Sequence, residues 1–243
     1  MTKLKKFLPT LILIFLQNIL LSFRLFKYKK PNFYCSVCKQ NSRGYLTGFF
    51  PKLTITCQNC HLKSSARLIA HYLKNININN KKILHFAPET QLVKMIKEKG
   101  DYQKYLLGDI ASSHEVMKVD IENIEFPENY FDLIICSHVL EHVDYIKASK
   151  NIRRVLKKNG IALLMFPIIE SWNKTYYNEN IKNDIDRTLH FLQFDHLQLF
   201  GRDIKNHLID ENCVLEQFTP FGEDCVKLGI NQGETLFILK KIN

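Results

Sequence analysis

Acidic residues are missing from the first third of this 243-residue chain, since no Asp or Glu precedes Glu89. The stretch up to Pro88 holds 15 Lys and Arg residues, whereas the remainder carries 19 basic and 24 acidic residues. The net charge of +10 therefore belongs to the N-terminal third. Such a cationic block favours an anionic partner, namely lipid headgroups, RNA or an acidic glycan, and a solvated basic face is the alternative.

A regular disulfide framework is also missing. The seven cysteines are an odd number without framework spacing, which argues against a secreted disulfide scaffold. The composition is 46% hydrophobic and 24% charged, so large-scale disorder is excluded. The length suits one α/β domain with a small appendage.

Four of the cysteines form two pairs, Cys35-x-x-Cys38 and Cys57-x-x-Cys60, which 18 residues separate. Each pair can point two thiolates at one metal, and two pairs complete the tetrahedral sulfur set that Zn²⁺ prefers. The spacing predicts a zinc-ribbon-like module over residues 31–66. Its role would be structural, because four protein ligands leave no position for water. A redox pair or chance spacing are the alternatives.

An apolar stretch, Phe7–Phe23, is flanked by lysines and arginines within residues 1–30. It is short for a bilayer span and contains Pro9 and several polar residues. We expect a helix that attaches to an anionic membrane surface, with a helix packed on the protein's own core as the alternative. The expected location is cytoplasmic, peripheral to or anchored at the inner membrane face.

Strand and helix patterns alternate from Lys81 onward, which predicts a mostly parallel sheet covered on both faces. Asn159-Gly160 is expected to end a helix over 145–158. The tail is expected to hold a helix over 202–212 and then two antiparallel strands with no helix between them. The expected strands cover Lys82–Ala87, Tyr105–Gly108, Val116–Val119, Phe131–Ser137, Ile161–Phe166, Val214–Phe218 and Thr235–Lys240.

The local sequence around the fourth strand resembles one family. Phe131-Asp132, the run His138-Val-Leu-Glu-His-Val143 and Arg154-Val-Leu-Lys157-x-x-Gly160 together resemble the class I S-adenosylmethionine-dependent methyltransferases. The resemblance covers roughly residues 67–243 and implies a Rossmann-like sheet. The cysteine pairs suggest a bacterial branch of that family with a zinc-ribbon-like module.

The resemblance implies which residues hold S-adenosylmethionine. Asp109 would accept the ribose hydroxyls, and Asp120 the adenine amino group. The family's glycine-rich turn is replaced by His85-Phe-Ala-Pro-Glu89, in which Ala87 is the smallest residue. The full expected set is His85, Ala87, Glu89, Asp109, Asp120, Ile121 and Ser137.

The acceptor chemistry is expected from His138, Asp195 and His196, with His196 as the preferred base. We expect a methyl transfer to a hydroxyl of a small molecule or glycan. An RNA methyltransferase with a zinc ribbon is the second choice, and a non-catalytic binding module with the same fold is the third.

Overall fold

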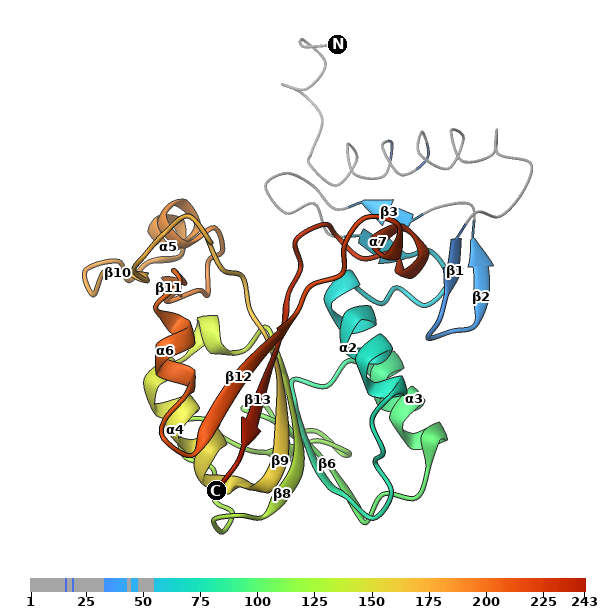
Figure 1. The fold of residues 1–243 in the computed structure, drawn as a ribbon. Helices are drawn as coiled ribbons and strands as arrows, with labels where there is room; N and C mark the ends of the chain where they lie inside the picture. The colour runs from blue at the N-terminus through green and yellow to red at the C-terminus, as the bar shows by residue number, and fades with distance from the viewer. Residues whose placement is uncertain (1–15, 17–18, 20–32, 43–44, 48–54) are drawn as a thin grey trace.

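The computed structural model describes residues 16, 19, 33–42, 45–47 and 55–243 (Figure 1). The elements are β1 Phe33–Cys35, β2 Gln40–Ser42, β3 Tyr45–Thr47, β4 Ile55–Cys57, α2 Ser64–Lys74, β5 Lys82–Phe86, α3 Thr90–Lys99, β6 Lys104–Asp109, β7 Met117–Lys118, β8 Phe131–Ser137, η2 Leu140–His142, α4 Tyr145–Val155, β9 Leu156–Met165, β10 Tyr176–Tyr177, α5 Asp184–Phe191, β11 Gln198–Leu199, α6 Ile204–Leu208, β12 Cys213–Phe218, α7 Glu223–Leu228 and β13 Leu236–Lys241.

The expected N-terminal helix over residues 1–30 lies outside the described residues, apart from two isolated positions. In the part of the chain that the structure describes, no helix has both the length and the apolar character needed to cross a bilayer.

The main sheet has seven strands in the order β12-β13-β9-β8-β5-β6-β7. Strand β5 pairs in parallel with β6 and β8, and β8 pairs in parallel with β9. Only β13 runs against its neighbours β9 and β12 within this sheet. This arrangement confirms the expected Rossmann-like α/β sheet, which is parallel and ends in an antiparallel pair.

Apolar residues cover both faces of the central strands. Ile83 of β5 belongs to a buried cluster with α2 and α3, whereas Leu84 and Phe86 belong to a second cluster with α4 and α6. Helices α2 and α3 accordingly lie on one side of the sheet, and α4 and α6 on the other (Figure 1). Alternate residues of one strand thus anchor two opposite helical layers.

The expected helix stop at Asn159-Gly160 is wrong. Helix α4 ends at Val155, and β9 begins at the next residue, so both residues lie inside a strand. Asn159 takes a left-handed conformation with φ 61°, and a Cβ on Gly160 would lie 2.8 Å from the carbonyl oxygen of Lys157. The pair therefore forms an irregular strand segment rather than a helix end.

The tail also differs from the expectation. A six-residue helix, α7, lies between β12 and β13, and the expected helix over 202–212 is only the five-residue α6. Helix α7 begins after Gly222 and ends before Gly229, which both have positive φ. It is too short to show a helical apolar period, which explains why the sequence pattern missed it.

Cys35 and Cys57 end strands β1 and β4, and Cys38 and Cys60 lie in the turns that follow them. Strand β1 pairs with β2, and β3 with β4, both antiparallel. Cys35 and Cys57 are buried in the same cluster as residues of α2. The guanidinium of Arg67, in α2, is also buried and donates to the carbonyl oxygens of Leu62 and Gly229. Arg67 therefore joins the end of the cysteine hairpins to the loop after α7.

Candidate active site

The carboxyl ends of β5 and β8 turn sharply without glycine. Ala87 follows β5 with φ 44°, and His138 follows β8 with φ 55°. Their backbone N–H groups donate to the carbonyl oxygens of Gly108 (2.9 Å) and Met165 (2.8 Å), which extends the parallel pairing by one bond. Left-handed backbone at these two residues turns the chain away from the sheet and opens the space above it.

A cavity of about 670 Å³ occupies that space. We call it the strand-end cavity. Six of its lining residues belong to the expected cofactor and catalytic sets, and they come from five different segments of the chain. They are Ala87, Asp109, Asp120, Ile121, His138 and Asp195.

The two aspartates are fixed by their own loops. Asp109 Oδ1 accepts the N–H of Ala111 (3.0 Å), and Asp120 Oδ1 accepts the N–H of Glu122 (2.8 Å). These contacts two residues onward hold each carboxylate at its strand end. Two fixed carboxylates in one cavity can accept hydrogen bonds from hydroxyl and amino groups of a bound molecule.

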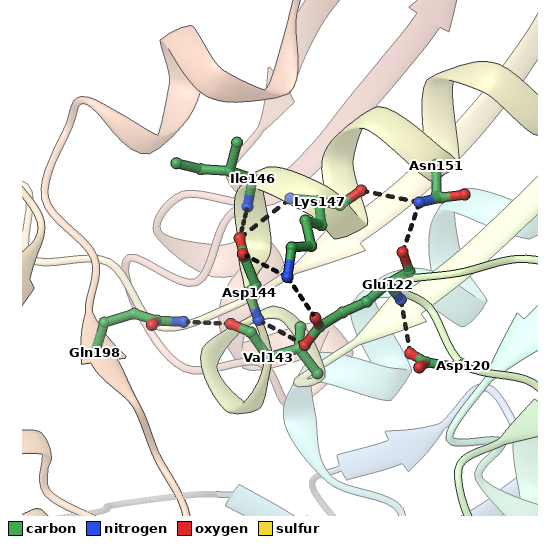
Figure 2. Close-up of polar contacts among 8 residues, drawn as sticks. All are labelled: Asp120, Glu122, Val143, Asp144, Ile146, Lys147, Asn151 and Gln198. Carbon is green, nitrogen blue, oxygen red and sulfur yellow. Dashed lines mark hydrogen bonds and ion pairs between the residues drawn. The ribbon is translucent and has the colours of Figure 1, made fainter. Parts of the chain in front are cut away.

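A polar network ties the Asp120 loop to the start of α4 (Figure 2). Glu122 Oε1 accepts the N–H of Asp144 (2.9 Å), and its carbonyl oxygen accepts the side-chain amide of Asn151 (2.8 Å). Lys147 lies between the carboxylates of Glu122 and Asp144, at 3.7 and 3.4 Å. The network holds one wall of the strand-end cavity against the helical layer.

Three of the expected cofactor residues, His85, Glu89 and Ser137, are not among the residues that line the strand-end cavity. His85 is fully buried, with Nδ1 2.8 Å from the hydroxyl of Tyr105 and Nε2 3.2 Å from Glu89 Oε2. Burial raises the pKa of Tyr105, so its hydroxyl stays protonated and donates to Nδ1. Nε2–H then donates to Glu89, because a carboxylate only accepts. His85 thus positions Glu89 at the start of α3.

Ser137, the last residue of β8, is buried, and its hydroxyl oxygen has no hydrogen-bond partner among the described residues. An unpartnered buried hydroxyl is uncommon in folded proteins. Ser137 directly precedes His138, which lines the strand-end cavity.

The residues expected to act on the acceptor differ in how deeply they are buried. His138 and Asp195 line the strand-end cavity, whereas His196 is 2% exposed and its Nδ1 lies 3.0 Å from the carbonyl oxygen of Phe191. The structure therefore brings His138, rather than His196, to the cavity wall. Partial burial acts to raise the pKa of Asp195, but the Gln193 amide and nearby His142 outweigh it and lower the net pKa.

Several lining residues were not among the expected site residues. Ile110, Val139, His142 and Val143 all line the strand-end cavity. Ile110 could have been found, because it directly follows a strand-end aspartate just as Ile121 does. The other three lie in the run His138–Val143 that carries the family resemblance, where a cavity residue and a packing residue look alike.

The four paired cysteines converge, with their sulfur atoms within 4.8 Å of one another. Cys35 Sγ lies 3.8 Å from Cys60 Sγ, and Cys38 Sγ lies 3.9 Å from Cys57 Sγ. Tetrahedral zinc with Zn–S bonds of about 2.3 Å requires sulfur atoms about 3.8 Å apart. The donor set and its spacing thus fit one zinc ion.

Comparison with known proteins agrees with this geometry. Residues 66–164 match the family described as "Methyltransferase domain". An uncharacterized protein of Methanocaldococcus jannaschii is 51% identical over 41 residues, which are 17% of this chain and 18% of the relative. The match thus spans less than a fifth of that relative's length.

Solved structures share the fold at low identity. An S-adenosylmethionine-dependent methyltransferase from Mesorhizobium loti has a TM-score of 0.51 and 13% identity, covering 72% of this chain and 98% of that one. A candidate S-adenosylmethionine-dependent methyltransferase from Listeria monocytogenes has a TM-score of 0.51 and 16% identity, covering 73% and 98%. Residues 66–164 therefore match a methyltransferase family model, and the chain has the fold of the S-adenosylmethionine-dependent methyltransferases.

Proposed function

We propose that this enzyme transfers the methyl group of S-adenosylmethionine to a hydroxyl group of a small molecule or glycan. The observation that carries the proposal is the place of His138. This residue lines the strand-end cavity and also a second cavity of about 480 Å³. A base between a cofactor cavity and an acceptor cavity is what methyl transfer to a hydroxyl requires.

The strand-end cavity suits S-adenosylmethionine. Asp109 and Asp120 supply acceptors for ribose hydroxyls and an adenine amino group, and Ile121 supplies an apolar surface for the ring. The unpartnered hydroxyl of Ser137 offers one more polar contact. When bound, the cofactor supplies an electrophilic methyl group on a sulfonium sulfur.

The second cavity, which we call the acceptor cavity, is bordered by residues 165–168 and 231–235. Asn231, Gln232 and Thr235 bring amide and hydroxyl groups to its wall. These groups suit a ligand with several hydroxyls, such as a sugar.

His138 is held by a buried carboxylate. Its Nδ1 lies 3.0 Å from Glu141 Oε1, and Glu141 is 1% exposed. Because the carboxylate accepts, Nδ1 carries the proton and Nε2 is left as the basic nitrogen. Nε2 would then take the proton of the acceptor's hydroxyl, and S-adenosylmethionine, when bound, would supply the methyl group.

We also propose that the cysteine cluster binds one structural Zn²⁺. The sulfur spacing described above supports this. A metal ion would supply the positive charge that a buried thiolate needs.

Residues 1–30 stay a proposed membrane attachment segment, because lysines and arginines flank their apolar stretch. Attachment there would place the enzyme at the cytoplasmic face of the inner membrane.

The first prediction concerns the cofactor. Asp109→Ala and Asp120→Ala should each weaken S-adenosylmethionine binding roughly ten- to a hundredfold, since each removes a charged acceptor that contributes about 1.5–3 kcal/mol. Calorimetric titration measures the change, with exposed Glu125→Ala as the control. Unchanged affinity in folded variants would show that the cofactor lies elsewhere.

The second prediction concerns the base. His138→Gln should lower kcat about 10²- to 10⁴-fold, because a general base is lost. The dissociation constant for S-adenosylmethionine should change little. S-adenosylhomocysteine release is measured with a panel of sugars and phenols, and exposed His114→Gln serves as the control. Methylation of RNA instead of any hydroxyl acceptor would favour the zinc-ribbon RNA methyltransferase.

The third prediction concerns the cysteines. The purified chain should contain about one zinc ion in this cluster, and the double variant Cys57→Ser/Cys60→Ser should lose it because two thiolate ligands are removed. Elemental analysis after gel filtration measures the content, with the single variant Cys225→Ser as the control. If the double variant kept its full zinc content, the assignment of the zinc ion to these cysteines would be contradicted.

The fourth prediction concerns the N-terminus. The full-length chain should float with vesicles of anionic lipid, whereas a chain lacking residues 1–30 should stay in the soluble fraction. Vesicles of neutral lipid are the control. Equal behaviour of both chains would leave the packed helix as the better interpretation.

A further inference from the structure

A second group of metal-binding side chains lies beside the strand-end cavity. Glu141, His142 and His196 each offer a ligand atom, and these atoms lie within 4.8 Å of one another. Two segments bring them together, namely η2 after β8 and the stretch before β11. The carbonyl oxygen of Glu141 accepts the N–H of Leu197 (2.9 Å), which fixes the two segments side by side.

The hydrogen bonds of both imidazole rings favour metal binding through Nε2. His142 Nδ1 lies 3.1 Å from the carbonyl oxygen of Asp195, and His196 Nδ1 lies 3.0 Å from that of Phe191. A carbonyl oxygen only accepts, so each Nδ1 carries a proton, and the neutral ring has its lone pair on Nε2. Metal-bound histidines in proteins are commonly oriented by such a bond from the other nitrogen.

The carboxylate of Glu141 supplies an independent observation. The side chain is 1% exposed, and Oε1 lies 3.0 Å from His138 Nδ1. Its other oxygen, Oε2, is buried and has no hydrogen-bond partner among the described residues. A buried carboxylate oxygen without a partner is costly, and a cation between it and two imidazoles would remove that cost.

We propose that Glu141, His142 and His196 bind one divalent transition-metal ion of the Zn²⁺ or Fe²⁺ class. Two histidines and one carboxylate are the donor set of catalytic zinc and non-haem iron sites, which keep a position open for another ligand. His142 also lines the strand-end cavity, so the open position would face that cavity. There the ion would lower the pKa of a bound water or hydroxyl group.

The geometry needs a small adjustment on binding. Tetrahedral zinc with bonds of about 2.0–2.1 Å requires ligand atoms about 3.3 Å apart, which is closer than the present limit of 4.8 Å. The two rings are already near, with centroids 4.8 Å apart and planes at 83°. Side-chain rotation of the carboxylate and one ring would bring the three ligand atoms together.

Cobalt can separate this site from the cysteine cluster, because only thiolate ligands give an intense sulfur-to-cobalt charge-transfer band. The full-length chain is stripped with a chelator, titrated with Co²⁺ and followed by absorption. We expect two equivalents to bind, of which one produces the charge-transfer band and the other only weak visible bands. Binding of a single, sulfur-ligated equivalent to the folded chain would overturn the proposal.

Variants assign the second equivalent. Glu141→Gln and His196→Gln should each weaken it at least tenfold while the charge-transfer band is kept. Exposed Glu128→Gln and His114→Gln are the matched controls. Retention of the second equivalent in both folded variants would also overturn the proposal.

If neither variant folds, X-ray absorption of the wild-type chain loaded with two zinc ions decides the question. Half of the zinc must then have nitrogen and oxygen ligands, and sulfur ligands alone would overturn the proposal. The metal measurement needs no methyl transfer. The proposed function and this site can therefore fail separately, since S-adenosylmethionine binding is measured independently.

Discussion

Burial of both faces of the central strands is the constraint on which the rest of this structure depends. Ile83 and Leu84 are neighbours in β5, yet each packs into a different cluster under a different helical layer. Strands covered in this way leave no exposed face for polar groups, so functional side chains collect where the strands end. Asp109 ends β6 and His138 follows β8, and both line the strand-end cavity.

The same constraint stabilises the turns at Ala87 and His138, which contain no glycine. A left-handed conformation at a residue other than glycine costs about 1–2 kcal/mol, and both Ala87 and His138 adopt it. Each keeps its backbone N–H paired with the neighbouring strand, so the sheet holds the strained turn in place. A larger side chain than Ala at position 87 would enter the cavity, which explains how the turn functions without a glycine.

The sequence could predict whatever depends on long apolar runs. The fourth strand, Phe131–Ser137, has the expected bounds, since its apolar pattern is strong. Local turn signals predicted element ends less well. The dipeptide Asn159-Gly160 was expected to end a helix, but pairing with neighbouring strands places it inside β9. In the site, strand-end position predicted that Asp109 would line a cavity. It could not distinguish His138 from His196, since their depths depend on how residues 195–198 pack against η2.

Because of that packing, Glu141 contacts the proposed general base, His138, and also belongs to the proposed metal site. One of its oxygens lies beside His138, and the other has no hydrogen-bond partner among the described residues. A carboxylate oxygen of Glu141 also lies within 4.8 Å of ligand atoms of His142 and His196. Removal of the carboxylate would therefore disturb base and metal together, whereas loss of His196 would leave the His138–Glu141 contact in place. Gln198 also donates to the carbonyl oxygens of Leu140 and Val143, so the turn that carries Glu141 is held from both sides. A buried carboxylate kept rigid in this way can serve two neighbours at once only if each oxygen has its own partner. For the second oxygen, a cation fits that requirement best.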